Sequence, residues 1–274
     1  MGMPVNVPER LSEGRFAWID APEDAPPALA IGDMAGHYER FRPSVVFPEG
    51  VTQDDLSRPE PLSFPTAGGV EAHALFYQPA SSSSCLVPGE KPPLVVMAHG
   101  GPTGRANPAF AFKVQWWTSR GFAVLDVNYR GSTGFGRKYR EALDQQWGVA
   151  DVEDCLAAVQ AMIERGLVDP QRCVIRGSSA GGLTVLSALA HSNLFAAGTS
   201  LYGVTDLRAL AEETHKFEAR YLDVLNGPYP EGEAVYLERS PVTHAGKIRV
   251  PVLFLHGGAD RVVPLAQAEA MRTK

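Results

Sequence analysis

A serine placed between glycines is the most reactive feature of this sequence. Ser179 is the central residue of Gly177-Ser178-Ser179-Ala180-Gly181, which follows the apolar run 173–176 and precedes a helix-like stretch over 182–190. A strand that turns sharply into a helix presents such a serine at the apex of the turn. Glycines are needed there because side chains would clash with the neighbouring strand and helix. The pattern predicts a nucleophilic hydroxyl that attacks a carbonyl carbon.

A serine nucleophile needs a base that is held in place by a carboxylate. Asp260 is the candidate acid, because it follows the apolar run 251–255 through a short turn. This position predicts that Asp260 lies at the carboxyl end of a parallel strand, the edge where such sheets place their sites. The alternative is that Asp260 only caps its own turn.

Two backbone N–H groups are candidates for the oxyanion hole. The first belongs to Ala180, the residue after the serine. The second belongs to Gly101 in His99-Gly100-Gly101-Pro102, a loop that directly follows the apolar run 94–98. Glycine there lets the backbone approach a substrate oxygen closely. The alternative for this loop is an ordinary turn after a strand.

The general base is missing from its expected place. In this arrangement the histidine follows the acid along the chain, yet none of the seven histidines follows Asp260. They are His37, His73, His99, His191, His215, His244 and His256. His99 and His256 belong to turns that present other site residues, so we expect structural roles for both. We therefore predict no catalytic histidine in this sequence, and a domain that is truncated within the helix beginning near Leu265.

The surrounding pattern alternates buried strands with helices. Continuous apolar runs at 94–98, 123–127, 173–176, 197–201 and 251–255 alternate with helical patterns, notably near 109–120 and 150–166. Such runs indicate strands covered on both faces, so we predict an α/β fold with a mostly parallel sheet and helices on both faces. A β-hairpin is predicted across Gly68-Gly69, between 62–66 and 70–77. Residues 1–60 show one short strand near 14–20 and are assigned as a leader, with the main domain over 61–274.

Composition narrows the classes of function. A net charge of −6 without a dense basic patch excludes a nucleic-acid surface, and no apolar run approaches the length of a membrane span. The three cysteines are widely spaced and contain no C-x-x-C pair. This spacing predicts neither a disulfide framework nor a metal site, and we expect no cofactor and a cytoplasmic location.

Several stretches together resemble the catalytic domain of prolyl oligopeptidase-type serine peptidases, particularly the bacterial dipeptidyl aminopeptidase/acylaminoacyl-peptidase group. They are 99–102, 128–136, Trp147-Gly148 with Asp151 and Asp154, 177–182, 214–222, 238–241 and 256–264. The resemblance covers roughly residues 60–274. It implies an α/β-hydrolase fold, Ser179 as nucleophile, Asp260 as triad acid, and Gly101 and Ala180 as oxyanion donors. It also implies a β-propeller before this domain, of which residues 1–60 could be a remnant.

The function predicted from these observations is a serine peptidase domain that hydrolyses short peptides or acyl-peptides through an acyl-enzyme. We expect its activity to be impaired, since no histidine follows the acid. A carboxylesterase and a non-catalytic binding module of the same fold remain open as alternatives. Truncation would leave the run 252–255 as an apolar sheet edge, which predicts possible self-association.

Overall fold

The computed structural model of the chain describes residues 3–4, 7–213 and 220–274. They fall into two compact units. The first combines the N-terminal 60 residues with 77–86 and 107–122, and the second contains 61–76, 87–106 and 123–274. All residues predicted to carry chemistry lie in the second unit.

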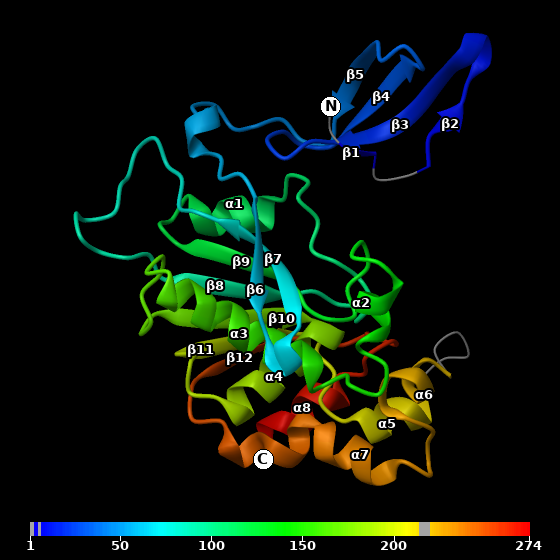
Figure 1. Cartoon of the computed structure of the whole chain (residues 1–274), viewed down its shortest axis with the longest axis vertical. Coiled ribbons are helices and arrows are strands. Elements are labelled where there is room, and N and C mark those ends of the chain that lie inside the picture. Colours follow the sequence, from blue (N-terminus) through cyan, green and yellow to red (C-terminus); the bar gives the residue numbers. More distant parts are fainter. Residues whose placement is uncertain (1–2, 5–6, 214–219) are drawn as a thin grey trace. The chain divides into compact units, whose positions relative to one another are not determined.

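The first unit contains a small antiparallel sheet in the order β1-β3-β4-β5, with β2 paired to β3 (Figure 1). Its strands are β1 (Met3–Pro4), β2 (Glu9–Arg10), β3 (Arg15–Ala21), β4 (Ala28–Asp33) and β5 (Tyr38–Pro43). The prediction of a single strand was wrong, because only β3 carries the apolar alternation that marks a strand. β4 contains alanine and glycine and β5 contains charged residues, so neither has the residue pattern of a strand. Pairing of β4 with β3, and of β5 with β4, stabilises them as strands. The unit also holds the helix α1 (Phe112–Thr118) and two 3₁₀ turns, η1 (Ser12–Gly14) and η2 (Gln53–Asp55).

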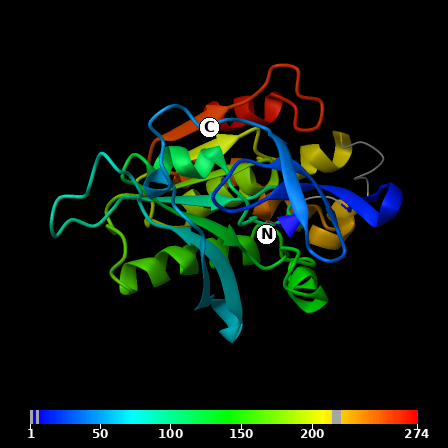
Figure 2. The ribbon, with the colours of Figure 1, turned by 90° about the horizontal axis from the view of Figure 1, so that it is seen from above.

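The described part of the second unit contains a seven-stranded sheet in the order β12-β11-β10-β8-β9-β7-β6. The bounds are β6 (Glu60–Pro65), β7 (Glu71–Tyr77), β8 (Leu94–Ala98), β9 (Ala123–Asn128), β10 (Cys173–Ser178), β11 (Ala197–Leu201) and β12 (Val252–Leu255). The strands from β12 to β9 are all parallel to one another. The predicted hairpin is present as β6 and β7, joined through the 3₁₀ turn η3 (Ala67–Gly69), and Figure 2 shows it in cyan at one edge of the sheet. The mostly parallel sheet predicted from the sequence is confirmed.

Helices complete the second unit. They are α2 (Arg137–Glu141), α3 (Ala150–Glu164), α4 (Ala180–His191), α5 (Leu207–Glu213), α6 (Tyr221–Asn226), α7 (Glu233–Arg239), the 3₁₀ helix η4 (Pro241–Lys247) and α8 (Ala266–Arg272). The two long helices, α3 and α4, pack against each other and against the sheet. The sequence predicted them and α8, but not the short helices α5 to α7, whose few turns carry little periodicity. None of the described helices combines the length and apolar character that crossing a bilayer requires.

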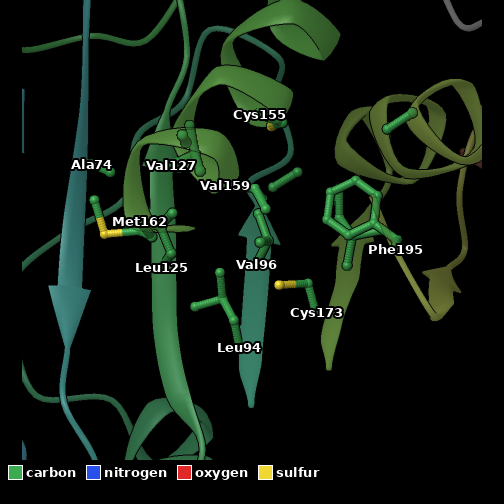
Figure 3. Close-up of a cluster of buried hydrophobic side chains, with 14 of the residues drawn as sticks. Ala74, Leu94, Val96, Leu125, Val127, Cys155, Val159, Met162, Cys173 and Phe195 are labelled. Carbon is green, nitrogen blue, oxygen red and sulfur yellow. The ribbon is translucent and has the colours of Figure 1, made fainter. Parts of the chain in front are cut away.

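The main core lies between the sheet and α3 and α4. Every residue of β8 is buried, which explains its continuous apolar run. Figure 3 shows Leu94 and Val96 of β8 gathered with Val159 of α3 and with Phe195, which lies two positions before β11. The same figure shows the strand that carries Ala74 pointing opposite to β8. This core holds the parallel strands in register, so that their carboxyl ends meet at one edge.

The turn between β10 and α4 depends on close backbone approach. A Cβ added to Gly181 would overlap the carbonyl oxygen of Ala98 and lie 2.7 Å from that of His99. A Cβ added to Gly177 would in turn overlap the carbonyl group of Gly181. Both positions therefore admit only glycine.

We predict that Gly181→Ala destabilises the protein by about 3 kcal/mol or more, because the new methyl group cannot be accommodated without moving β8. Helix propensity alone would favour alanine in this first turn of α4 by about 1 kcal/mol, so the two effects have opposite signs. The free energy of unfolding in urea measures the outcome. Gly246→Ala is the control, because nothing lies within 4 Å of its added Cβ. Equal stability of the two variants would contradict the steric argument.

Candidate active site

Ser179 lies at the N-cap of α4 in a strained backbone conformation. Its φ of 54° and ψ of −121° are rarely adopted by a residue with a side chain. Three hydrogen bonds hold this conformation: its N–H donates to Leu201 O (3.0 Å), and its carbonyl accepts from Gly182 N (2.9 Å) and Val204 N (3.2 Å). Its side chain is not buried. The predicted strand–turn–helix context of Ser179 is confirmed.

A cavity of about 50 Å³ opens beside this serine. Its lining residues are Gly101, Pro102, Trp147, Ser179, Ala180, Val204, Leu210, Tyr221, Leu222, Val262 and Val263. The structure thus brings together Ser179 and both predicted oxyanion donors, Gly101 and Ala180. It also brings in Val262 and Val263, which follow Asp260 in its turn. Apart from the serine hydroxyl, the tyrosine and the indole nitrogen, the side chains are apolar.

The loop 99–104 lies against the serine. A Cβ added to Gly100 would be 3.4 Å from Ser179 Cβ, and Gly101 has a φ of 119°. His99 supports this loop from below: its Nδ1 donates to Gly100 O (2.9 Å), and its ring stacks on Tyr129 at 4.2 Å between centroids. Its Nε2 lies 2.8 Å from Ser132 Oγ. His99 therefore has the structural role that the sequence predicted.

Asp260 lies on the same edge of the sheet as Ser179. The register pairs Ser178 with Leu201, and Leu201 with Leu255, so the turns after β10 and β12 leave the sheet at the same edge, with β11 between them. Asp260 Oδ1 accepts hydrogen bonds from Val262 N (2.9 Å) and Val263 N (3.0 Å). These bonds hold the pKa of Asp260 below its usual range, with the bond from Val263 the stronger cause. The carboxylate thus caps its turn through Oδ1, and within the described residues no bond engages Oδ2.

No described histidine lines the cavity. His256 Nε2 lies 2.7 Å from Val263 O, so it braces the turn that carries Asp260. His244 is engaged with Glu238 O, at 2.6 Å. His215 lies outside the described residues. The structural role expected for His256 agrees with this geometry.

Several cavity residues were not singled out from the sequence as site residues. Trp147 and Tyr221 come from stretches that carry the family resemblance, but neither has the residue type of a nucleophile, base or acid. Leu210 and Leu222 belong to short helices that the sequence did not predict. Only the tertiary structure places these side chains beside Ser179. No group of three or more His, Cys, Asp or Glu residues that could bind a metal occurs in the described part of the chain.

A buried carboxylate connects α3 to the helix that carries the serine. Asp151 is fully buried and accepts hydrogen bonds from Thr184 Oγ1 (2.5 Å) and Gly148 N (2.7 Å). Burial raises the pKa of Asp151 to about 6, although both hydrogen bonds act in the opposite direction. The neighbouring Asp154 is bound by Arg130, with a nitrogen–oxygen distance of 2.8 Å. These buried links hold α3 and α4 together behind the elbow.

Comparison with known proteins adds independent information on this site. The model of the prolyl oligopeptidase family matches residues 108–274, which is more than half of the chain. The acylamino-acid-releasing enzyme of Arabidopsis thaliana is 33% identical over 202 residues, 68% of this chain and 25% of that protein. The chain belongs to the prolyl oligopeptidase family of serine peptidases. The predicted α/β-hydrolase fold and the predicted family are both confirmed.

Relatives within the prolyl oligopeptidase family include peptidases of different specificity. The dipeptidyl aminopeptidase BIII of Pseudoxanthomonas mexicana is 33% identical over 183 residues, 65% of this chain and 27% of that protein. A solved structure of a puromycin-hydrolysing peptidase from Mycobacterium tuberculosis has a TM-score of 0.91 and 43% identity, and covers 95% of this chain and 39% of that chain. The chain therefore spans between a quarter and two fifths of the length of these relatives.

We predict that Asp151→Asn becomes more stable relative to the wild type as the pH rises. The folded-state pKa of Asp151 is about 6, above the unfolded value of 3.8. The wild type therefore loses stability between these two values as the pH rises, and the asparagine variant does not. The stability difference between the two proteins should change by roughly 2 kcal/mol between pH 4 and pH 7, measured by urea unfolding.

Asp169→Asn provides the control for this titration. Hydrogen bonds from the Gln171 backbone and the Arg172 side chain lower the pKa of the partly exposed Asp169. Its contribution to stability is present above the unfolded pKa and is lost as the pH falls, so its variant should show the opposite trend. A pH-independent difference between Asp151→Asn and the wild type would contradict the burial argument.

Proposed function

We propose that this chain cleaves peptide or acyl-peptide bonds through an acyl-enzyme on Ser179. The observation that carries the proposal is the shared cavity: the strained serine, Gly101 and Ala180 all line it. The oxygen of Ser179 attacks the carbonyl carbon, and the N–H groups of Gly101 and Ala180 stabilise the resulting oxyanion. The intermediate then expels the amine, and water releases the acyl group.

A base must take the serine proton in the first step and return a proton to the departing amine. Asp260 would orient that base through Oδ2, since Oδ1 already accepts two backbone N–H groups. In the expected chain order this base is a histidine after the acid, and none of the seven histidines follows Asp260 in the sequence. We infer that the 274 residues, as an isolated polypeptide, hold the serine, the acid and the oxyanion donors without their base.

The cavity supports a preference for an apolar residue on the acyl side of the scissile bond. Its walls include Leu210, Leu222 and Val263, with the rings of Trp147 and Tyr221. A charged side chain would lose its hydration there without gaining a partner of opposite charge among the described lining residues. The likeness to a puromycin-hydrolysing peptidase supports the same class, because puromycin is an amide of an aromatic amino acid. Membership of a peptidase family also favours amide hydrolysis over the carboxylesterase alternative.

We also propose a division of the chain into two parts. Residues 61–274 would form the peptidase domain, and residues 1–60 a remnant of a propeller. In support, the residues assigned to the chemistry all belong to the second unit. The first 60 residues form a small antiparallel sheet, the kind of element from which propeller blades are built.

We predict that the 274-residue chain hydrolyses an aminoacyl p-nitroanilide slowly, and that added imidazole accelerates it. Without a base the rate should fall by roughly 10⁴–10⁶ relative to a complete triad. The residual rate comes from substrate binding and oxyanion stabilisation, which remain. Imidazole can diffuse to Ser179 and take its proton. The release of p-nitroaniline as a function of imidazole concentration measures this effect.

Two controls make this experiment decisive. Ser179→Ala should abolish both the basal and the imidazole-dependent rate. A fluorophosphonate probe, which reacts with the serine hydroxyl, should label the wild type and not this variant. Fast hydrolysis without imidazole, lost in Ser179→Ala, would show that the chain contains a working base. A folded wild type that is unlabelled and shows no hydrolysis even with added imidazole would instead favour the non-catalytic binding module.

We also predict self-association through β12. This strand ends the sheet order, and Leu253 and Leu255 on one of its faces are 54% and 48% exposed. An apolar edge strand with unpaired backbone groups can pair with a second copy. Sedimentation velocity should show oligomers that Leu253→Lys dissociates, whereas Leu167→Lys, an exposed position after α3, should leave them intact. A stable wild-type monomer would contradict this prediction.

A further inference from the structure

The hydroxyl group of Tyr221 is attached to the loop that carries the proposed oxyanion donor. It donates to Gly101 O at 3.0 Å and lies 2.7 Å from Thr103 Oγ1. Thr103 N also points at the same oxygen, at 3.4 Å. Tyr221 begins α6, more than a hundred residues further along the chain. These contacts are therefore tertiary, and they are made with the carbonyl of Gly101 itself and with Thr103, two residues further on.

The peptide group before Gly101 is anchored from the other side. His99 Nδ1 donates to Gly100 O at 2.9 Å. Because a trans peptide is planar, its N–H points opposite to its C=O, so fixing Gly100 O also fixes the direction of the Gly101 N–H. The carbonyl that Tyr221 holds belongs to the following peptide group. His99 and Tyr221 thus restrain the two peptide planes that meet at Gly101 Cα.

This restraint acts on a segment with little stiffness of its own. Glycines at 100, 101 and 104 allow the backbone many conformations, and Gly101 has a φ of 119°. Rotation of the peptide before Gly101 would turn its N–H away from an oxyanion on the substrate. An oxyanion donor is effective only when its direction is set before the charge develops.

We propose that Tyr221 is a positioning residue for the oxyanion hole, whose hydroxyl keeps the Gly101 N–H directed at the developing negative charge. The inference rests on the proposed function of Ser179 and Gly101. The same tyrosine also lines the cavity assigned to the substrate side chain. A substrate side chain in the cavity would contact the ring of Tyr221, whose hydroxyl restrains the oxyanion loop. Binding of this side chain is thereby coupled to the orientation of the Gly101 N–H.

The test compares two ligands on Tyr221→Phe and on the wild-type chain. The first is a short peptide ending in a boronic acid after a leucine-like residue, and the second is the matching peptide carboxamide. With the boronic acid, the Ser179 oxygen bonds to boron, the hydroxyl proton is released to solvent, and a negatively charged tetrahedral adduct forms. The carboxamide fills the same cavity but places no negative charge against Gly101.

We expect Tyr221→Phe to weaken binding of the boronic acid by roughly 10- to 100-fold, as for a misaligned oxyanion donor. Binding of the carboxamide should change less than about twofold, because the aromatic ring and the cavity remain. Tyr229→Phe is the matched control: its hydroxyl donates to Glu212, and it does not line the cavity. It should bind both ligands as the wild type does.

The possible outcomes separate the two levels of the proposal. Equal affinity of the wild type and Tyr221→Phe for the boronic acid would overturn the positioning role and leave the proposed function intact. Equal loss of affinity for both ligands would also overturn it, because Tyr221 would then only shape the cavity. If the wild type binds the boronic acid no better than the carboxamide, the proposed function fails, and the inference fails with it. Thr103→Val offers a second variant, expected to weaken boronic acid binding in the same selective way but less.

Discussion

The close approach of three backbone segments at the elbow governs the rest of the site. The carbonyl groups of Ala98 and Gly181 occupy the space that side chains at Gly181 and Gly177 would need. This contact allows α4 to begin directly above β8 and β10, and it leaves the chain at Ser179 with a single sharp turn. The φ of 54° at Ser179 is the result, and the hydrogen bonds from Gly182 and Val204 to its carbonyl offset part of the strain.

The parallel sheet places the oxyanion loop and the turn of Asp260 beside the elbow. Because β8, β10 and β12 run in the same direction, the loop 99–104, the elbow and the turn of Asp260 leave the sheet at one edge. Each of these turns is braced by a histidine or a backbone donor rather than by bulky packing. His99 holds Gly100 O, and His256 holds Val263 O. The imidazole rings of His99 and His256 thereby fix backbone groups, while the serine hydroxyl lies beside a cavity whose described lining is mostly apolar.

Behind this edge, buried polar links resist deformation. Asp151 joins the start of α3 to Thr184 of α4, and the Arg130–Asp154 pair ties the loop after β9 to α3. Placing carboxylates in a core is costly, and the raised pKa of Asp151 reflects this cost. Paired and hydrogen-bonded groups of this kind permit few alternative packings, so the helix that carries the serine has a defined position.

The sequence by itself determined the family, the residues proposed for the chemistry and most of the framework. The glycine spacing around Ser179 and the apolar runs of β8 and β9 depend on local sterics and burial, which a sequence records residue by residue. The strands at 94–98 and 197–201 match their predicted bounds for that reason. What only the tertiary structure decided is which distant side chains surround the serine. Tyr221 contacts Gly101, and Leu222 and Trp147 line the cavity beside Ser179, because the short helix α6 and the segment before α3 pack near the elbow. Their positions result from packing between elements, and no local pattern in the sequence records that packing.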